Sequence, residues 1–347
     1  MVAEGADFVV GVDTHGKRHW FALVEVRTGA LVREWELPAR ADGYRRALEL
    51  VRHLGAGRRL WALEGSGCYG AGLARFLLAV GESVREVERP LRRGSQGRLK
   101  NDSLDALRAA RAAFERPLPT PRADGAREGL RVLLATREQA VDVRRVGLNQ
   151  LRALLVTGPD GLRQRLSGLT PRRLPDRCST LRVPADAGEA ERASVLALKL
   201  CARRVLAATH EAQTLEREIE QTVRTLAPTL LAEPGVGPIS AGFLLPGWSH
   251  HGRLRSEAAF ARLAGSAPIP ASSGKLTRHR LDRGGDRRLN RALHTIVLAR
   301  RRSDPATIAY IQRRVSEGKS TREAVRCLKR YLARHLYRLL EQTTTTT

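Results

Sequence analysis

The 347-residue sequence predicts an α/β domain followed by a mostly helical remainder. Two observations predict this fold class. Up to Phe114, short apolar runs with a two-residue period alternate with helical patterns. After a proline-rich stretch at 117–125, which we interpret as a linker, most of the chain follows long helical patterns.

The first part of the chain predicts five strands and three helices in the order βββαβαβα. Strands are expected at 8–12, 20–26, 31–37, 60–63 and 84–87, and helices at 41–54, 73–80 and 103–114. Apolar residues alternate through the second strand, and Thr28-Gly29 supplies a turn signal after it. We therefore expect the first three strands to be antiparallel.

The remainder predicts a helical spacer and a C-terminal domain. Two long amphipathic helices are expected at 130–155 and 193–226, separated by an irregular, basic segment at 158–182. The pattern changes from Leu230 onward, where we expect an apolar helix at 239–245, a module at 260–302 and a final helix at 321–340. The predicted domains are 1–116, 117–228 and 229–342, with a disordered tail at 343–347.

The charge balance favours a polyanionic partner. Lys and Arg number 61 against 36 Asp and Glu, a formal net charge of +25. No apolar run is long enough to span a bilayer, and the short acidic N-terminus does not resemble a secretory signal, so we expect a cytoplasmic protein without a membrane partner. The four cysteines are widely spaced and predict no zinc site.

Four carboxylates are candidates for a metal site. Asp13 follows the first predicted strand, Glu64 follows the fourth, and Asp102 and Asp105 open a helix on one face. The ends of adjacent strands can bring the first two together, and a helix start nearby can add the others. Such oxygen ligands bind hard divalent cations, and two cations about 4 Å apart clamp a phosphodiester.

Each acid taken alone also has an ordinary structural explanation. An aspartate after a strand is commonly a turn residue, and Asp102 is a reasonable N-cap with Asp105 favoured by the helix dipole. The four acids together favour a metal centre, because crowded carboxylates repel one another without a cation.

A serine-containing loop beside basic residues is a second candidate site. Ser272 and Ser273 precede Gly274 in a stretch of small residues. The basic residues that follow are Lys275, Arg278, Arg280, Arg283 and Arg287. The loop could place a hydroxyl at a phosphate while guanidinium groups stabilise the developing charge. On the residues alone, a turn beside a nucleic-acid-binding surface is the simpler interpretation.

Two glycines suggest a further nucleic-acid contact. Gly235 and Gly237 lie in a Pro-Gly-Val-Gly-Pro stretch similar to the hairpin of a helix-hairpin-helix module. Glycine lets the backbone approach a phosphate closely, and the helix that follows presents free N–H groups. A tight turn between two helices is the alternative interpretation.

Three N-terminal segments resemble the DEDD motifs of the IS110 family of transposases: 10–15, 63–67 and 100–106. This resemblance implies an RNase H-type, RuvC-like N-terminal domain. It also implies that Asp13, Glu64, Asp102 and Asp105 act on DNA with Mg²⁺ as the working ion.

Two C-terminal segments resemble the same family. Residues 267–275 are similar to its APxPxxSGK loop, and residues 284–293 are similar to its GGxRxxNRAL helix. The resemblance implies that the loop serine is a nucleophile that becomes linked to DNA, for which Ser273 is the best match and Ser272 the second. Trp248 departs from the pattern, since family members often carry an aspartate there.

The sequence therefore predicts a DNA recombinase that mobilises an insertion sequence through a covalent serine intermediate assisted by Mg²⁺. The resemblance further implies a structured guide RNA that pairs with donor and target DNA, bound by the basic central region, and we expect a homo-oligomer, a dimer or tetramer. One rival is a metal-dependent nuclease or Holliday junction resolvase, which needs the acids but not Ser273. Another is a non-enzymatic nucleic-acid-binding protein left by a decayed element.

Overall fold

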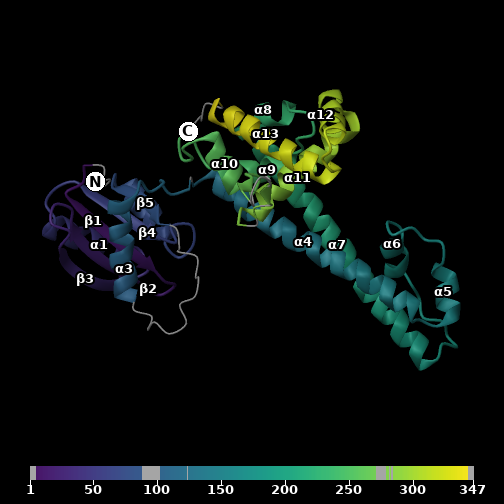
Figure 1. Ribbon diagram of the computed structural model, residues 1–347. Helices are drawn as coiled ribbons and strands as arrows, with labels where there is room; N and C mark the ends of the chain where they lie inside the picture. Colours follow the sequence, from purple (N-terminus) through teal and green to yellow (C-terminus); the bar gives the residue numbers. More distant parts are fainter. Residues whose placement is uncertain are drawn as a thin grey trace. The chain divides into compact units, whose positions relative to one another are not determined.

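The computed structural model describes residues 5–87, 102–122, 124–270, 279–280, 282 and 284–342. The chain forms two compact units (Figure 1). Unit 1 comprises Met1–Asp124 with Gly252–Leu254, and unit 2 comprises Gly125–His251 with Arg255–Thr347. None of the helices in the described ranges combines the length and apolar character that crossing a membrane requires.

A five-stranded sheet forms the centre of unit 1. Its strands are β1 (Phe8–Thr14), β2 (Arg18–Glu25), β3 (Leu31–Pro38), β4 (Arg59–Glu64) and β5 (Ser83–Val87). They lie in the order β3-β2-β1-β4-β5. The first three are antiparallel, as predicted, while β4 runs parallel to β1 and β5 parallel to β4.

Three helices cover the two faces of this sheet. They are α1 (Ala41–Leu54), α2 (Ala71–Ala79) and α3 (Asp102–Glu115). The first two bury large apolar side chains such as Leu48 and Leu73 against one face, to which β4 contributes Trp61. The third packs an alanine-rich face, including Ala109, Ala110 and Ala113, against the other. Small side chains let α3 lie close to the strands, which matters for the site described below.

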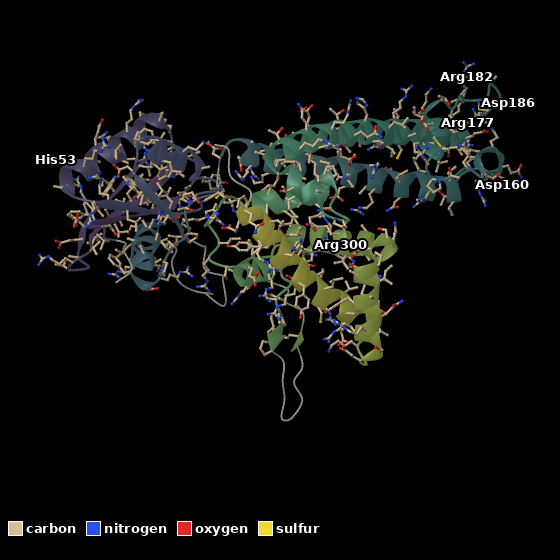
Figure 2. All side chains as sticks on the ribbon, turned by 90° about the horizontal axis from the view of Figure 1, so that it is seen from above. His53, Asp160, Arg177, Arg182, Asp186 and Arg300 are labelled. Carbon is tan, nitrogen blue, oxygen red and sulfur yellow. The ribbon has the colours of Figure 1, made fainter. Side chains whose placement is uncertain are left out.

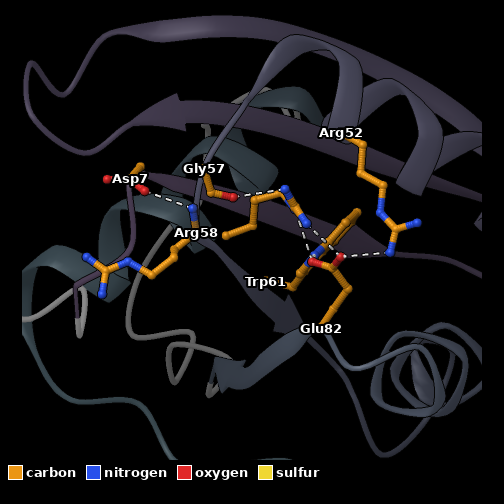
Figure 3. Close-up of polar contacts among 7 residues, drawn as sticks. Asp7, Arg52, Gly57, Arg58, Trp61 and Glu82 are labelled. Atoms are coloured by element: carbon orange, nitrogen blue, oxygen red, sulfur yellow. Dashed lines mark hydrogen bonds and ion pairs between the residues drawn. The ribbon is translucent and has the colours of Figure 1, made fainter.

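A buried carboxylate ties β4 to the sheet edge (Figure 3). Glu82, just before β5, accepts a hydrogen bond of 3.0 Å from Trp61 Nε1 and contacts the guanidinium groups of Arg59 and Arg52 at 3.0 and 3.4 Å. Burial opposes ionisation, but the hydrogen bonds from Arg59 and Trp61 outweigh it and hold the pKa of Glu82 below its ordinary value.

Unit 2 is built on two long helices, α4 (Ala126–Val156) and α7 (Glu189–Leu226), which lie side by side (Figure 1). Their contact depends on a small residue, because a Cβ added at Gly147 would lie 2.5 Å from Val205 Cγ2. Buried Cys201 lies in the same interface and donates a hydrogen bond to the Gly147 carbonyl. The two predicted long helices are thus confirmed.

The prediction of an irregular segment at 158–182 is wrong. The segment contains α5 (Asp160–Leu166) and α6 (Leu174–Ser179), which cover the end of the α4–α7 pair (Figure 1). Leu162, Leu174 and Cys178 are buried there in one apolar cluster with residues of α4 and α7. Two helices of seven and six residues are too short to show a helical period against so many arginines.

Further helices and a small hairpin complete unit 2. They are α8 (Pro228–Ala232), α9 (Pro238–Trp248), α10 (Glu257–Leu263), the strands β6 (Ile269–Pro270) and β7 (His279–Arg280), α11 (Arg287–Ser303), α12 (Pro305–Ser316) and α13 (Thr321–Gln342). The predicted module at 260–302 is therefore two helices with a hairpin between them. The helix α11 ends at Ser303 because Asp304 is the N-cap of α12 and Pro305 is the first residue of α12.

Candidate metal centre and serine segment

The strand register places Asp13 and Glu64 on the same face of the sheet. Val12 of β1 pairs with Leu63 of β4 in parallel, so the next residue along each strand is one of the two acids. Side chains alternate along a strand. Asp13 therefore points to the same face as Val9, and Glu64 to the same face as Leu60, which is the face covered by α3.

Close packing brings the start of α3 to these strand ends. A Cβ added at Gly11 would clash with the Ala106 carbonyl oxygen and the Ala110 nitrogen. Only glycine lets the α3 backbone approach β1 this closely. Because Asp102 opens the helix and lies about one turn before Ala106, this contact positions it near Asp13.

His15 links two of the predicted acids. Its Nε2 lies 3.0 Å from Asp13 Oδ2 and 3.6 Å from Asp102 Oδ1. One ligand atom from each of these three side chains lies within 4.8 Å of the others, which is a group able to hold a metal ion. His15 itself is positioned by β2, since its backbone N–H donates to His19 Nδ1 at 3.3 Å.

The other two predicted acids lie beside this group but are not members of it. Asp105 forms an ion pair of 2.6 Å with Arg108, one turn further along α3. The Glu64 backbone carbonyl accepts a hydrogen bond of 2.7 Å from Thr14 Oγ1, which joins the ends of β1 and β4. All four acids thus lie on or beside one edge of the sheet, and Asp13 and Asp102 converge.

The electrostatics of the group suit a cation. Burial raises the pKa of Asp13, and the carboxylates of Asp105 and Asp102 raise it further, while His15 acts in the opposite direction. Asp13 is only 4% exposed, so water screens its charge poorly. A donor set of carboxylate oxygens with one imidazole nitrogen fits a divalent cation such as Mg²⁺ or Mn²⁺.

The predicted nucleophile lies outside the described residues, and so do several of its neighbours: Ser272, Ser273, Lys275, Arg278 and Arg283. The segment that contains the serines begins directly after β6 and ends directly before β7, and these strands pair in antiparallel fashion. Arg280 on β7 and Arg287 at the start of α11 are both exposed. Both are therefore available for a phosphate contact.

The base of the hairpin is held by two glycines and an asparagine. A Cβ at Gly285 would overlap the backbone of Gly265, which itself has a φ of 58°. Asn290 Nδ2 donates to the carbonyls of Ala264 and Gly265 at 2.7 and 3.0 Å. Asp286 caps α11 by accepting from the N–H of Arg288 and Leu289. Gly285 and Asn290 of the GGxRxxNRAL segment thus have structural roles.

The predicted glycine hairpin before α9 packs inside unit 2. Gly235 has a φ of 73°, and an added Cβ would lie 2.9 Å from the Ile296 carbonyl oxygen of α11. Arg300 secures the turn by donating to the Pro234 carbonyl at 2.7 Å. Gly237 is the N-cap of α9 and has open space around its Cα. Packing therefore accounts for Gly235, while Gly237 remains a predicted contact.

Trp248, which departs from the family pattern, is a core residue here. It is fully buried at the end of α9. Its indole N–H donates to Glu341 of α13, and the Arg127 guanidinium lies 5.0 Å from its ring centroid. A side chain in this position packs the helices together.

Comparison with known proteins agrees with this arrangement. A family model described as Transposase, for the DEDD transposases of IS110, matches residues 10–158. A second model, described as Transposase IS116/IS110/IS902 family, matches residues 227–312. The first match covers most of the acid-bearing α/β unit and α4, and the second covers part of the helical unit. Both family models and the relatives described next support an insertion-element transposase of the IS110 family.

Two relatives support this assignment. The insertion element IS900 uncharacterized 42 kDa protein of Mycobacterium paratuberculosis is 28% identical over 335 residues, which cover 88% of this chain and 82% of the relative. The insertion element IS110 uncharacterized 43.6 kDa protein of Streptomyces coelicolor is 33% identical over 143 residues, which cover 40% of this chain and 35% of that relative.

Sequence reasoning missed His15 as a member of the acidic group. The signal that could have found it is its spacing, because residues two apart on a strand point to the same face. His15 follows Asp13 at that spacing, directly after β1 ends.

Proposed function

We propose that this transposase cuts and rejoins DNA through a covalent serine–phosphate intermediate, with Mg²⁺ held by Asp13, Glu64, Asp102 and Asp105. The convergence of Asp13, His15 and Asp102 at the edge of the sheet carries the metal-dependent part of the proposal, and the match of residues 227–312, which contain Ser273, to a transposase model supports the serine part. The β3-β2-β1-β4-β5 order, with helices on both faces, supports an RNase H-like, RuvC-like class for unit 1.

The acids and the serine have distinct tasks in this proposal. Mg²⁺ held by the acids would supply positive charge to the phosphate oxygens and would make the attacking oxygen a better nucleophile. The Ser273 oxygen forms a bond to phosphorus, its proton passes to a base, and the bond from phosphorus to the departing deoxyribose oxygen breaks. That oxygen takes up a proton. Rejoining reverses the step with a different DNA end, so no net hydrolysis occurs.

The nucleic acids of this reaction are donor and target DNA, and we propose a structured guide RNA as a further partner. The net charge of +25 supports polyanion binding. Arg177 and Arg182 project at the end of the α4–α7 pair, where they are exposed (Figure 2). Backbone and shape recognition would suffice there, because base pairing carries the sequence information. The long helices are the proposed interface of a homo-oligomer.

A metal-dependent nuclease without serine chemistry is the second candidate. The clustering of Asp13, His15 and Asp102 favours it equally, because that group lies wholly within unit 1 and does not involve Ser273. Such an enzyme would leave a free 5′ end with no protein attached.

A trapping assay separates the two candidates. The protein, the element-encoded RNA, labelled donor and target DNA and Mg²⁺ are incubated and denatured, and protein-linked DNA is measured for the wild type, Ser273→Ala, Ser272→Ala and Asp13→Ala. We expect an adduct that is lost in Ser273→Ala and Asp13→Ala and kept in Ser272→Ala. Cleavage without an adduct, unchanged by either serine substitution, would leave the metal nuclease as the function.

A further inference from the structure

A pocket of about 900 Å³ lies beside the β6–β7 hairpin within unit 2. Its walls come from the base of the hairpin, including Pro268 and Arg280, and from the α12–α13 turn and the first half of α13. Five of its six cationic residues lie beyond residue 312, where the second family match ends. The cationic residues are Arg280, Arg314, Lys319, Arg326, Lys329 and Arg330.

The charges of this pocket are strongly unbalanced. Only Asp282 and Glu323 oppose the six cations of its lining. Glu323 is engaged by Ser320, whose hydrogen bonds lower its pKa, and Asp282 accepts from the Gly284 N–H at 2.8 Å. Among the residues that the structure describes, Arg314 alone of the six cations has a carboxylate within 4.0 Å, that of Glu317. The pocket is therefore a concentrated positive region.

Lys329 gives this pocket a buried cation that pairs with no carboxylate of the described residues. The side chain is 6% exposed, and its Nζ donates to Asn290 Oδ1 at 2.8 Å. Burial, followed by the charge of Arg326, lowers the pKa of Lys329. No carboxylate within the described part of the chain lies within 4.0 Å of its Nζ. Burying an unpaired charge is costly, so an anionic ligand would relieve the cost.

Asn290 connects this lysine to the hairpin. The same amide that accepts from Lys329 donates to the carbonyls of Ala264 and Gly265, at the start of the chain segment that leads to β6. Lys329 is thus fixed relative to the hairpin that carries the serine segment.

Tyr331 adds an aromatic surface to the cations. It is 55% exposed in the pocket wall, and its ring packs edge-on against Tyr310 with 6.1 Å between centroids. An exposed aromatic ring beside a basic groove is the combination that binds unpaired nucleic-acid strands, with phosphates on the cations and a base stacked on the ring.

We propose that this pocket binds an unpaired DNA strand, with its backbone phosphates at Lys329, Arg326 and Arg330 and one base against Tyr331. The volume is of the size that accepts small ligands, which suits a few nucleotides and not the face of a duplex. DNA is the favoured strand because Ser273 lies in the sequence between β6 and β7, and the pocket is lined by Pro268, directly before β6, and by Arg280 of β7. This choice rests on the proposed function.

Binding of a fluorescent single-stranded DNA 20-mer to the full chain tests the proposal, with anisotropy recorded over a salt series. Every protein in the assay also carries Ser273→Ala, and EDTA removes divalent cations. The assay therefore measures binding without catalysis. We expect the double variant Arg326→Ala/Arg330→Ala to weaken binding at least tenfold. The slope of log K against log salt should fall by about 1.4, since each lost contact to a single strand removes about 0.7.

Two further variants and a control sharpen the result. Lys329→Met should lower the slope by about 0.7, and Tyr331→Ala should weaken binding roughly tenfold without changing the slope. Arg322→Ala removes an exposed arginine of the same helix outside the pocket and should have little effect. Thermal melting verifies that each variant is folded. If Lys329→Met does not fold, the double variant still tests the proposal, because Arg326 and Arg330 are exposed.

The outcomes separate this proposal from the proposed function. Equal affinities for the Ser273→Ala parent, the double variant and the control would overturn the proposed strand-binding pocket, even if the wild type forms the serine adduct. If the pocket variants lost binding to a single-stranded RNA of the same sequence more than binding to the DNA, the pocket would be an RNA site and the proposal would be overturned. Loss of DNA binding in the pocket variants and not in Arg322→Ala would support the proposal that the pocket binds a DNA strand, even if no serine adduct is ever trapped.

Discussion

Gly285 packs directly against the backbone of Gly265, so closely that a Cβ on Gly285 would overlap its nitrogen and also approach the Leu263 carbonyl oxygen to 2.9 Å. The contact joins the start of α11 to the turn before β6. The hairpin that leads to the candidate serine is therefore held by a contact that leaves no room for any side chain.

Gly285→Ala should separate these two backbones. We expect a loss of about 1 to 3 kcal/mol in the free energy of unfolding, because the neighbouring atoms are main chain and cannot move aside cheaply. The serine adduct should fall in parallel. Gly284→Ala is the matched control, since its Cβ would meet only Asp282 Oδ1 at 3.3 Å. Equal melting temperatures of the two variants would contradict the role given to Gly285.

Gly11→Ala should displace α3 from β1. The new methyl group would clash with the backbone of Ala106 and Ala110, so the helix must shift and carry Asp102 away from Asp13. We expect lower stability and at least tenfold weaker Mn²⁺ binding, measured by calorimetry. A Cβ at Gly67 would meet nothing within 4 Å, so Gly67→Ala should keep both properties. Unchanged Mn²⁺ affinity in Gly11→Ala would show that the metal lies elsewhere.

His15→Ala should change which metal the site prefers. Imidazole nitrogen suits Mn²⁺ better than Mg²⁺, so the variant should lose about tenfold in Mn²⁺ affinity and less in Mg²⁺ affinity. Loss of ¹⁴N coupling in the electron spin echo spectrum of bound Mn²⁺ reports the missing ligand directly. His53→Ala, at an exposed position on α1, is the control. A coupling that persists in His15→Ala would place His15 outside the coordination sphere.

Glu82 should contribute an acid-sensitive part of the stability. Its folded pKa lies below the ordinary value of 4.5, so the stabilisation is complete above pH 4.5 and is lost as the pH falls through the lowered pKa. Glu82→Gln removes the charge beside Arg59 and Arg52 and should cost about 3 kcal/mol at pH 7. Urea titrations from pH 7 to pH 3 measure this difference, which should shrink towards pH 3.

The exposed Glu49 on the same unit supplies the comparison for Glu82. Glu49→Gln should follow the wild-type curve at every pH, because this side chain lies exposed on α1. If the free energy of unfolding differed by the same amount between Glu82→Gln and the wild type from pH 7 to pH 3, the charge of Glu82 would not contribute to stability.

Much of unit 1 could be predicted from periodicity. The helix expected at 41–54 is α1 to the residue, and the strand expected at 60–63 is β4 without its end residues. These elements have clear apolar patterns and turn residues at their ends. The prediction for the segment at 158–182 was wrong because its helices depend on burial against α4 and α7, a tertiary effect that a short window does not contain.

The site was predictable in its parts but not in its assembly. Strand ends and a helix start located the four acids, yet nothing in the sequence says that β4 lies beside β1 with Val12 opposite Leu63. The approach of α3 depends on a contact between Gly11 and Ala106, residues far apart in the chain. Lys329 was equally hidden, because its burial follows from its packing with Asn290 of α11.

The cysteines of this chain differ in how exposed their thiols are, so a thiol-reactive dye can be directed to one of them. Burial raises the pKa of Cys178 to about 11 and also raises the pKa of Cys201, so both thiols stay protonated and shielded at neutral pH. Cys68 is exposed four residues after Glu64, and Cys327 is half-buried. With Cys327 replaced by serine, a maleimide dye would attach at Cys68 and report cation binding by fluorescence without any engineered residue at the site.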